Sequence, residues 1–137
     1  MDRPAIAAEL DPELIELTTR YLAVVDAGDL DAMERFYAPE FVNIRYDSLG
    51  QAANIPLAIF MNILRGWAAA GDDHPLPAAE QTTFVATSRF SDCASVLMLR
   101  VKGSETVAYN FVWQQQDGQW RVLREFTYHE KLPGGDD

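Results

Sequence analysis

Three polar side chains of different chemistry share one face of a strand-like stretch in the first half of the chain. Side chains alternate across a strand, so Asn43, Arg45 and Asp47 of residues 41–47 lie on the same side. If that side points inward, its amide, cation and carboxylate suit an anionic or hydroxyl-rich ligand. Arginine cannot accept a proton at neutral pH because its pKa stays above ~12, which leaves Asp47 as a candidate proton carrier. The alternative is a solvated polar face on which Arg45 pairs with Asp47 or with an acidic loop.

Two further candidates for proton transfer lie near the C-terminus. Glu125 shares one face of the stretch 120–128 with Thr127, and in an apolar pocket desolvation would raise the pKa of its carboxyl group and suit it to general acid or base chemistry. On the surface, Glu125 would instead form a cross-strand ion pair with an arginine. His129 follows this stretch and is a candidate general base. It stands far from His74, the other histidine, without metal-ligand spacing, so no metal site is expected.

Flat apolar side chains are available to surround these groups. Tyr109, Phe111 and Trp113 share one face of the stretch 106–114, and Trp67 lies on the apolar stripe of a predicted helix. Rings of this kind supply the apolar walls of small-molecule sites, where a few polar groups fix the orientation of the ligand.

The elements that position these residues begin with helices. Apolar residues at helical spacing predict three of them, at 12–27, 30–37 and 56–70. Asp11 can cap the first helix, and Gly28 can end it in the left-handed conformation. The apolar stripe of the third helix comprises Ile59, Phe60, Ile63, Leu64 and Trp67.

Alternation replaces the helical period from Gln81 onward and predicts four strands, at 82–90, 94–102, 106–114 and 120–128. The connections between them are short turn formers, Ser91-Asp92, Gly103-Ser104 and Asp117-Gly118. Such short connections require antiparallel hairpins, because parallel pairs need a long crossover. Helices followed by a strand meander predict an α+β fold.

The totals favour one domain and argue against several classes of partner. A chain of 137 residues can bury one core, expected over about 11–130 with flexible ends at 1–10 and 131–137. The net charge of −10 without clustered Lys and Arg argues against nucleic-acid binding, and no apolar stretch is long enough for a membrane span. Cys93 is the only cysteine, so we expect a buried thiol in a cytoplasmic protein.

Two segments resemble the nuclear transport factor 2-like superfamily. Residues 21–41, with Ala-Gly-Asp-Leu-Asp at their centre and Phe-Tyr-Ala-Pro-Glu-Phe at their end, are similar to its opening, and Asp-Gly-Gln-Trp-Arg-Val at 117–122 is similar to its last hairpin. The resemblance implies a cystatin-like cone, in which N-terminal helices and a curved, mainly antiparallel sheet enclose a cavity. It also implies a homodimer through the outer sheet face. The branch with the greatest similarity contains small bacterial lumazine-binding or polyketide cyclase-like proteins.

The isomerases of this superfamily show what the resemblance implies for single residues. In them a tyrosine and a protonated aspartate donate hydrogen bonds to an oxyanion, and a second carboxylate moves the proton. Tyr21 falls at the tyrosine position, where it could stabilise negative charge or could instead be a core aromatic with a bonded hydroxyl. The base position falls at Arg45 and the acid position near Tyr109 or at Asn110, so this isomerase chemistry is not expected. On the last strand, the residues directed toward the cavity are Leu123, Glu125 and Thr127.

Three functions are compatible with these residues. The first is a small-molecule-binding domain of unknown ligand, with an apolar, aromatic-lined cavity and no cofactor. The second is a lyase or isomerase, polyketide cyclase-like or dehydratase-like, acting on an aromatic or polyketide-like substrate. The third is a non-catalytic dimeric association module. The candidate proton carriers are Asp47, Glu125 and His129, and the candidate ligand contacts are Tyr21, Asn43, Arg45, Trp67, Tyr109, Phe111 and Trp113.

Overall fold

The computed structural model describes residues 9–46, 51–70, 81–103 and 105–131. The helices in these ranges are α1 (Pro12–Ala27), α2 (Leu30–Glu34) and α3 (Leu57–Ala69). The strands are β1 (Tyr37–Tyr46), β2 (Ala52–Pro56), β3 (Gln81–Phe90), β4 (Cys93–Lys102), β5 (Glu105–Gln116) and β6 (Gln119–Lys131). None of the described helices combines the length and apolar character needed to cross a membrane.

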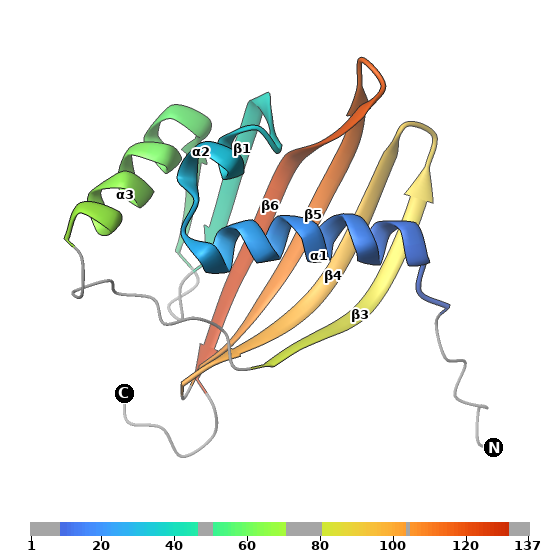
Figure 1. The fold of residues 1–137 in the computed structure, drawn as a ribbon. Helices are drawn as coiled ribbons and strands as arrows, with labels where there is room; N and C mark the ends of the chain where they lie inside the picture. Colours follow the sequence, from blue (N-terminus) through green and yellow to red (C-terminus); the bar gives the residue numbers. More distant parts are fainter. Residues whose placement is uncertain (1–8, 47–50, 71–80, 104, 132–137) are drawn as a thin grey trace.

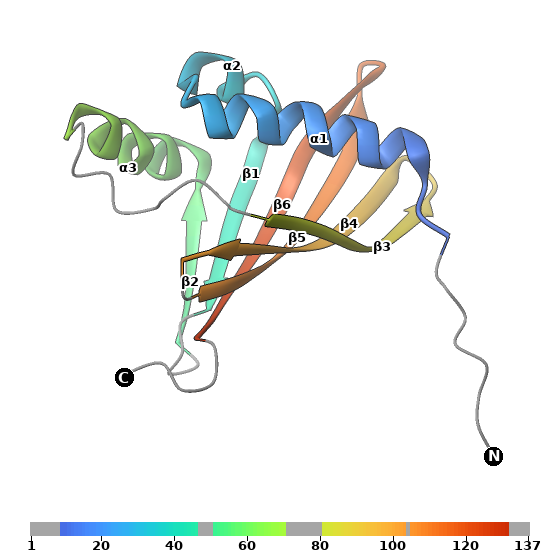
Figure 2. The same ribbon diagram turned by 60° about the horizontal axis from the view of Figure 1, so that its bottom comes forward.

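One six-stranded sheet organises the molecule, in the order β2-β1-β6-β5-β4-β3. Neighbouring strands are antiparallel, except that β1 runs parallel to β6. Figures 1 and 2 show the three helices on one face of this curved sheet, with α1 lying across the strands. We call this the inner face and the opposite side the outer face. The predicted α+β fold, with N-terminal helices packed on a mainly antiparallel sheet, is confirmed.

Helix α1 is bound to the sheet by carboxylate–arginine contacts near both of its ends. At its start Asp11 caps the helix and forms an ion pair with Arg89 of β3, with 2.7 Å between Nε and Oδ2. Near its end both carboxylate oxygens of Asp26 accept hydrogen bonds from Nη2 of Arg100 in β4, at 3.0 and 2.9 Å. These two connections fix how α1 crosses the strands and therefore which of its side chains face the sheet.

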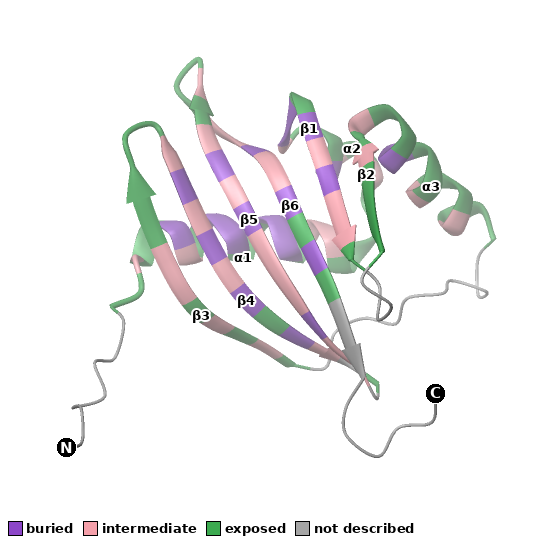
Figure 3. Ribbon diagram, turned by 180° about the vertical axis from the view of Figure 1, so that it is seen from behind, coloured by how far each residue is buried: buried purple, intermediate pink, exposed green. Residues whose placement is uncertain are grey.

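The core lies between the helices and the inner face. Burial alternates along β4 and β5, which appears as bands along these strands in Figure 3. The face predicted for β5 is buried, since Val107, Phe111 and Trp113 are at most 1% exposed. The largest fully buried side chains are Trp113, Phe41, Phe111, Leu14, Met61 and Met98.

The boundary between α2 and β1 differs from the prediction. Helix α2 ends at Glu34, and Tyr37, which was expected in the helix, is the first residue of β1. The ring of Tyr37 packs on that of Phe41, with centroids 4.4 Å apart. The register of β1 against β6 shifts between Tyr37 and Val42. The strand can therefore contain Pro39, because proline is tolerated where the ladder is interrupted.

Strand β2 is missing from the prediction. It pairs with β1 at one edge of the sheet, and four of its five residues are exposed. An exposed edge strand needs no apolar alternation, so the sequence carries no periodic signal for it.

The apolar stripe predicted for α3 is only partly correct. Phe60 and Met61 are buried, at 5% and 1% exposed, whereas Ile59 and Ile63 are 54% and 36% exposed. Helix α3 packs at the edge of the sheet, against β1, β2 and α2. Only a narrow side of the helix is covered there, so two of the predicted stripe residues remain outside.

Cys93 is not the buried thiol that was expected. It opens β4 and is partly exposed, and its thiol donates to Oδ1 of Asp92 at 3.5 Å. Burial and the neighbouring Asp92 carboxylate raise the pKa of this thiol. A nucleophilic cysteine needs the opposite shift, so the environment does not activate Cys93.

Candidate functional site

Buried polar side chains gather on the inner face where β1 and β6 run side by side. Their centre is Glu125, which is 5% exposed. Nδ2 of Asn43 donates to Oε2 of Glu125 at 2.6 Å and to Oγ1 of Thr127 at 3.2 Å. The hydroxyl of Tyr21, on α1, donates to Oε1 of Glu125 at 3.5 Å. A carboxylate removed from water is stable only when its oxygens accept hydrogen bonds. With Tyr37, these residues form what we call the polar cluster.

Two phenols connect the polar cluster to the core beneath α1. The hydroxyl oxygens of Tyr21 and Tyr37 are 2.6 Å apart, which is a hydrogen bond. Burial raises the pKa of both phenols well above 10.0, and the Glu125 carboxylate contributes to both shifts. Both therefore keep their protons at neutral pH. Because Tyr21 donates to Glu125, Tyr37 is the donor to Tyr21, and the three groups form a chain from phenol to phenol to carboxylate.

A β-bulge in β6 sets the direction of Glu125. Two neighbouring residues of β5 lie opposite Arg124 and Val122, so Leu123 is an extra residue in β6. Strict alternation would place Val122 and Glu125 on opposite faces, whereas here they are buried, at 0% and 5% exposed. The inward position predicted for Leu123 is therefore occupied by Val122, and Leu123 itself is only partly buried.

Two arginines influence the pKa of a third phenol on the inner face. Tyr109 of β5 pairs with Thr127 of β6 and is partly buried. Burial and the Glu125 carboxylate raise the pKa of Tyr109, while Arg100 and Arg45 oppose this shift. Both guanidinium groups are therefore near enough to influence the phenol electrostatically, and both lie on the side of the sheet that carries the polar cluster.

The two arginines differ in their hydrogen-bond partners. Arg100 is 4% exposed, and its guanidinium binds both oxygens of Asp26 and donates from Nε to Oγ1 of Thr82 at 3.1 Å. Arg45 pairs across the strands with Thr127, and its buried Nε has no hydrogen-bond partner in the part of the chain that is described. The inner face therefore holds one satisfied cation and one with an unused donor.

The aromatic residues predicted to form pocket walls divide into two groups. Tyr21, Phe111 and Trp113 are at most 2% exposed, and the ring of Tyr21 packs edge-to-face on the other two with centroids 5.3 and 5.9 Å apart. Tyr109 and Trp67 are only partly buried, and Tyr109 stacks on Phe111 at 5.8 Å. The ring of Tyr21 thus belongs to the core, while its hydroxyl belongs to the polar cluster.

Two predicted proton carriers lie outside what the structure describes. Asp47 falls in the gap at 47–50. The backbone of His129 is part of β6, opposite Val107, but its side chain is not among the described ones. The roles of Asp47 and His129 stay predictions, and Glu125 is the candidate that the structure places among buried polar groups.

Sequence reasoning missed two residues of this region. Tyr37 was assigned to a helix, and alternation gives no clear signal for it, because the exposed Pro39 lies between Tyr37 and the inward-facing Phe41. Arg100 gave no signal either, because a single charged residue in an alternating strand is usually exposed. Its burial depends on Asp26, a partner distant in the sequence.

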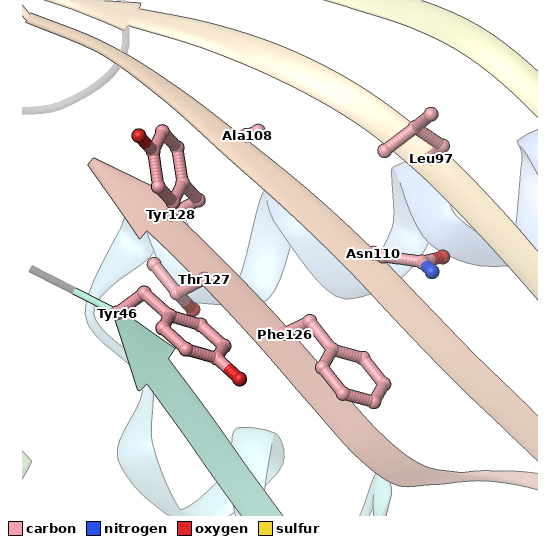
Figure 4. A pocket seen from close by; sticks show the side chains of 7 residues that line it. All are labelled: Tyr46, Leu97, Ala108, Asn110, Phe126, Thr127 and Tyr128. Carbon is pink, nitrogen blue, oxygen red and sulfur yellow. The ribbon is translucent and has the colours of Figure 1, made fainter. Parts of the chain in front are cut away.

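A shallow apolar hollow lies on the outer face, across the sheet from the polar cluster (Figure 4). Its volume is about 180 Å³, and it is lined by Tyr46, Leu97, Ala108, Asn110, Phe126, Thr127 and Tyr128. Tyr46, Phe126 and Tyr128 are 36 to 47% exposed. The Oδ1 atom of Asn110 is buried there without a hydrogen-bond partner among the described residues. Asn110, one of the two positions considered for the isomerase acid, therefore faces away from the polar cluster.

Comparison with known proteins identifies the fold. No family model matches the sequence, and no curated protein matches it. Solved structures do. A nuclear transport factor 2-like protein of unknown function from Shewanella baltica OS155 is 11% identical, with a TM-score of 0.66 over 86% of this chain and 91% of its own. A second one, from Silicibacter pomeroyi DSS-3, is 15% identical, with a TM-score of 0.64 over 85% and 92%. The chain has the nuclear transport factor 2-like fold.

A third match widens the range of proteins that share this architecture. A structure from Thiobacillus denitrificans ATCC 25259, assigned as a calcium/calmodulin-dependent protein kinase type II association domain, is 17% identical, with a TM-score of 0.64 over 95% and 99% of the two chains. At such identities the likeness concerns the fold. The nuclear transport factor 2-like resemblance of the sequence is thus confirmed for the fold, and the lumazine-binding or polyketide cyclase-like branch stays a prediction.

Proposed function

We propose that this nuclear transport factor 2-like domain binds a small molecule at the inner face of its sheet, beside the polar cluster. The observation that carries this proposal is Glu125, a carboxylate only 5% exposed that Asn43 holds at 2.6 Å and Tyr21 at 3.5 Å. Buried polar networks add little stability compared with apolar side chains of similar volume. A ligand that uses the carboxylate is a reason for the chain to keep it there.

The neighbouring side chains supply the other contacts that a small molecule needs. Tyr109, opposite Thr127, is a partly buried ring that can contact a flat apolar ligand, and Trp67 of α3 stays a predicted contact. Arg45 and Asn43 can orient its polar groups. A mainly apolar site with a few fixed polar groups is the usual composition of a small-molecule site.

Native mass spectrometry of protein taken directly from lysate tests this proposal. We expect one small-molecule adduct per chain, lost on denaturation and depleted in Glu125→Gln, which replaces an acceptor oxygen by a donor. The outer-face variant Phe126→Ala is the control and should retain the adduct. Wild-type protein without any adduct, or an adduct lost only in Phe126→Ala, would contradict binding at the inner face.

Catalysis at the same site is the second candidate, because two phenols and a carboxylate are linked in one chain. In a lyase or isomerase acting on an aromatic or polyketide-like substrate, Glu125 would take a proton from the carbon beside a carbonyl group. Tyr109 would donate a hydrogen bond to the oxygen on which negative charge develops. Deuterium exchange at the methyl group of acetophenone, followed by NMR, should then be faster with wild type than with Glu125→Gln. Equal rates would exclude this activity on simple ketones.

Two copies of the chain would associate through the outer face. The support for this third proposal is the exposure of large apolar side chains there, including Leu99, Phe126 and Tyr128 at 37, 36 and 47%. Exposed apolar surface of this kind marks association sites. Sedimentation at micromolar concentration should show a dimer for wild type and a monomer for Phe126→Glu. A wild-type monomer would refute the association, and small-molecule binding would be unaffected.

A further inference from the structure

The Nε–H group of Arg45, which lacks a hydrogen-bond acceptor among the described residues, indicates the chemical class of the ligand. We infer that the inner-face site takes a ligand with a carboxylate group, which Arg45 binds, and with a flat body that lies near Tyr109. This inference rests on the proposed small-molecule function and adds the charge and orientation of the ligand.

The first support is the state of Arg45 itself. Its Nε is buried and has no acceptor, and no carboxylate lies within ion-pair distance of its guanidinium in the described part of the chain. A buried N–H without an acceptor loses its hydrogen bond to water and gains nothing in return. Arg45 Nε is one of five buried side-chain N and O atoms without a hydrogen-bond partner among the described residues, and it is the one that carries a positive charge. A bound acceptor would satisfy it.

Arg100 shows what the same side chain looks like when its role is structural. It lies on the same inner face, and Asp26 and Thr82 satisfy its guanidinium. Among the described residues Arg45 has no such set of partners, although both cations are close enough to Tyr109 to oppose the rise in its pKa that burial causes. Within that part of the chain, the unused donor therefore belongs to the arginine without a structural partner.

The carboxylate of Glu125 fixes the orientation of the ligand. Asn43 is the β1 residue opposite Glu125, and Arg45 is two positions further along, about 7 Å away at ordinary strand spacing. A ligand carboxylate is repelled by Glu125 and attracted by Arg45, so it lies at the Arg45 end of the site. Nε and one Nη of a guanidinium form parallel hydrogen bonds that match the two oxygens of a carboxylate.

Benzoate and benzamide form the probe pair that tests this inference, because they have the same shape and differ in charge. Calorimetric titration should show wild type binding benzoate about 10- to 100-fold more tightly than benzamide, the range expected for a charged hydrogen bond. Arg45→Gln should lose that preference and bind both alike. Arg20→Gln makes the same change of charge on the exposed side of α1 and should behave as wild type.

Each other result overturns the inference. Equal binding of the two probes by wild type, retention of the benzoate preference in Arg45→Gln, or binding of neither probe would each show that the site does not select a carboxylate through Arg45. The small-molecule function is judged separately, by the adduct in native mass spectrometry. An adduct without a benzoate preference would therefore refute the inference that the ligand carries a carboxylate, while the small-molecule function would still hold.

A measurement without ligand gives a second readout. Arg45→Met keeps most of the length of the side chain and removes the unsatisfied donor, so the melting temperature of the ligand-free protein should rise by about 3 °C or more. Such a gain in stability with a loss of binding is expected when a residue serves a ligand. A fall in melting temperature would show that Arg45 supports the fold, and would contradict the inference.

Discussion

The two faces of the sheet are built from the same strands and differ in what they bury. On the inner face, polar groups are enclosed by helices and bound to one another, as Asn43 is to Glu125 at 2.6 Å. On the outer face, apolar rings remain partly exposed around the hollow, and Phe126 directly follows Glu125 in the chain. Each face therefore carries some groups that its surroundings do not favour: buried polar groups beside the apolar core on the inner face, and exposed apolar rings on the outer face.

This difference favours two kinds of partner for one sheet, a small ligand on the inner face and a protein surface on the outer face. Paired polar groups in a dry interior are already oriented, so they can bind a small ligand without rearranging. Exposed apolar rings gain stability when another protein surface covers them. The alternation of side chains along β5 and β6 produces these two faces, and we propose small-molecule recognition on one and association of two copies through the other.

The largest expected effect comes from truncating one phenylalanine on each face. Phe111→Ala on the inner face should reduce the free energy of unfolding by about 3–5 kcal/mol, because the side chain is 1% exposed and its removal leaves a cavity. Phe126→Ala on the outer face should cost about 1 kcal/mol, since the side chain is already 36% exposed. Urea unfolding at the lowest workable protein concentration measures both without stabilisation by a dimer. Similar losses for the two variants would show that both faces are equally packed.

The next effect concerns coupling within the polar cluster. A double-mutant cycle of Asn43→Ala and Glu125→Gln should show a coupling energy of about 1–3 kcal/mol, because the two side chains share a short hydrogen bond in a dry environment. Asn110→Ala with Glu125→Gln is the matched control across the sheet and should be additive. A coupling energy near zero between Asn43 and Glu125 would mean that the cluster is not a unit.

The smallest effect is the pH dependence contributed by Tyr21. Its pKa is raised in the folded protein, so above pH 10, the ordinary value for the phenol, the unfolded chain releases a proton that the folded chain keeps. Stability should therefore fall as the pH rises, by up to about 1.4 kcal/mol per pH unit for each such phenol. Tyr21→Phe should lose about 1 kcal/mol at pH 7.

This difference between wild type and Tyr21→Phe should shrink between about pH 10 and 11, where the contribution of the wild-type phenol is itself lost. Urea unfolding at pH 7, 10 and 11 measures it. Identical slopes for the two proteins above pH 10 would show that the phenol of Tyr21 titrates like an exposed one.

Most of the fold could be predicted because local signals and packing agree. The capped α1 and the alternating β4 and β5 each bury one face, and their sequences show the matching period. Strand β2 could not be predicted, because an exposed edge strand leaves no apolar pattern. The start of β1 was missed because Phe36 and Tyr37 also fit the helical spacing of the preceding residues.

The candidate site was less predictable, because it depends on contacts between distant residues. Alternation placed Asn43 and Arg45 on one strand face, as the structure does. The bulge at Leu123 is not visible in the sequence, since it arises from the pairing of β6 with β5. The partners of Glu125 come from α1 and β1, and the hydrogen bond of Tyr37 to Tyr21 could not be inferred once Tyr37 was placed in a helix.

Two asparagine side chains on opposite faces of the sheet provide the most direct test of inner-face binding. In a two-dimensional NMR titration of ¹⁵N-labelled protein with benzoate, the Nδ2 signals of Asn43 report on the inner face and those of Asn110 on the outer face. We predict that the Asn43 signals shift with saturation while the Asn110 signals stay in place. Saturable shifts at Asn110 with none at Asn43 would contradict the assignment of ligand binding to the inner face.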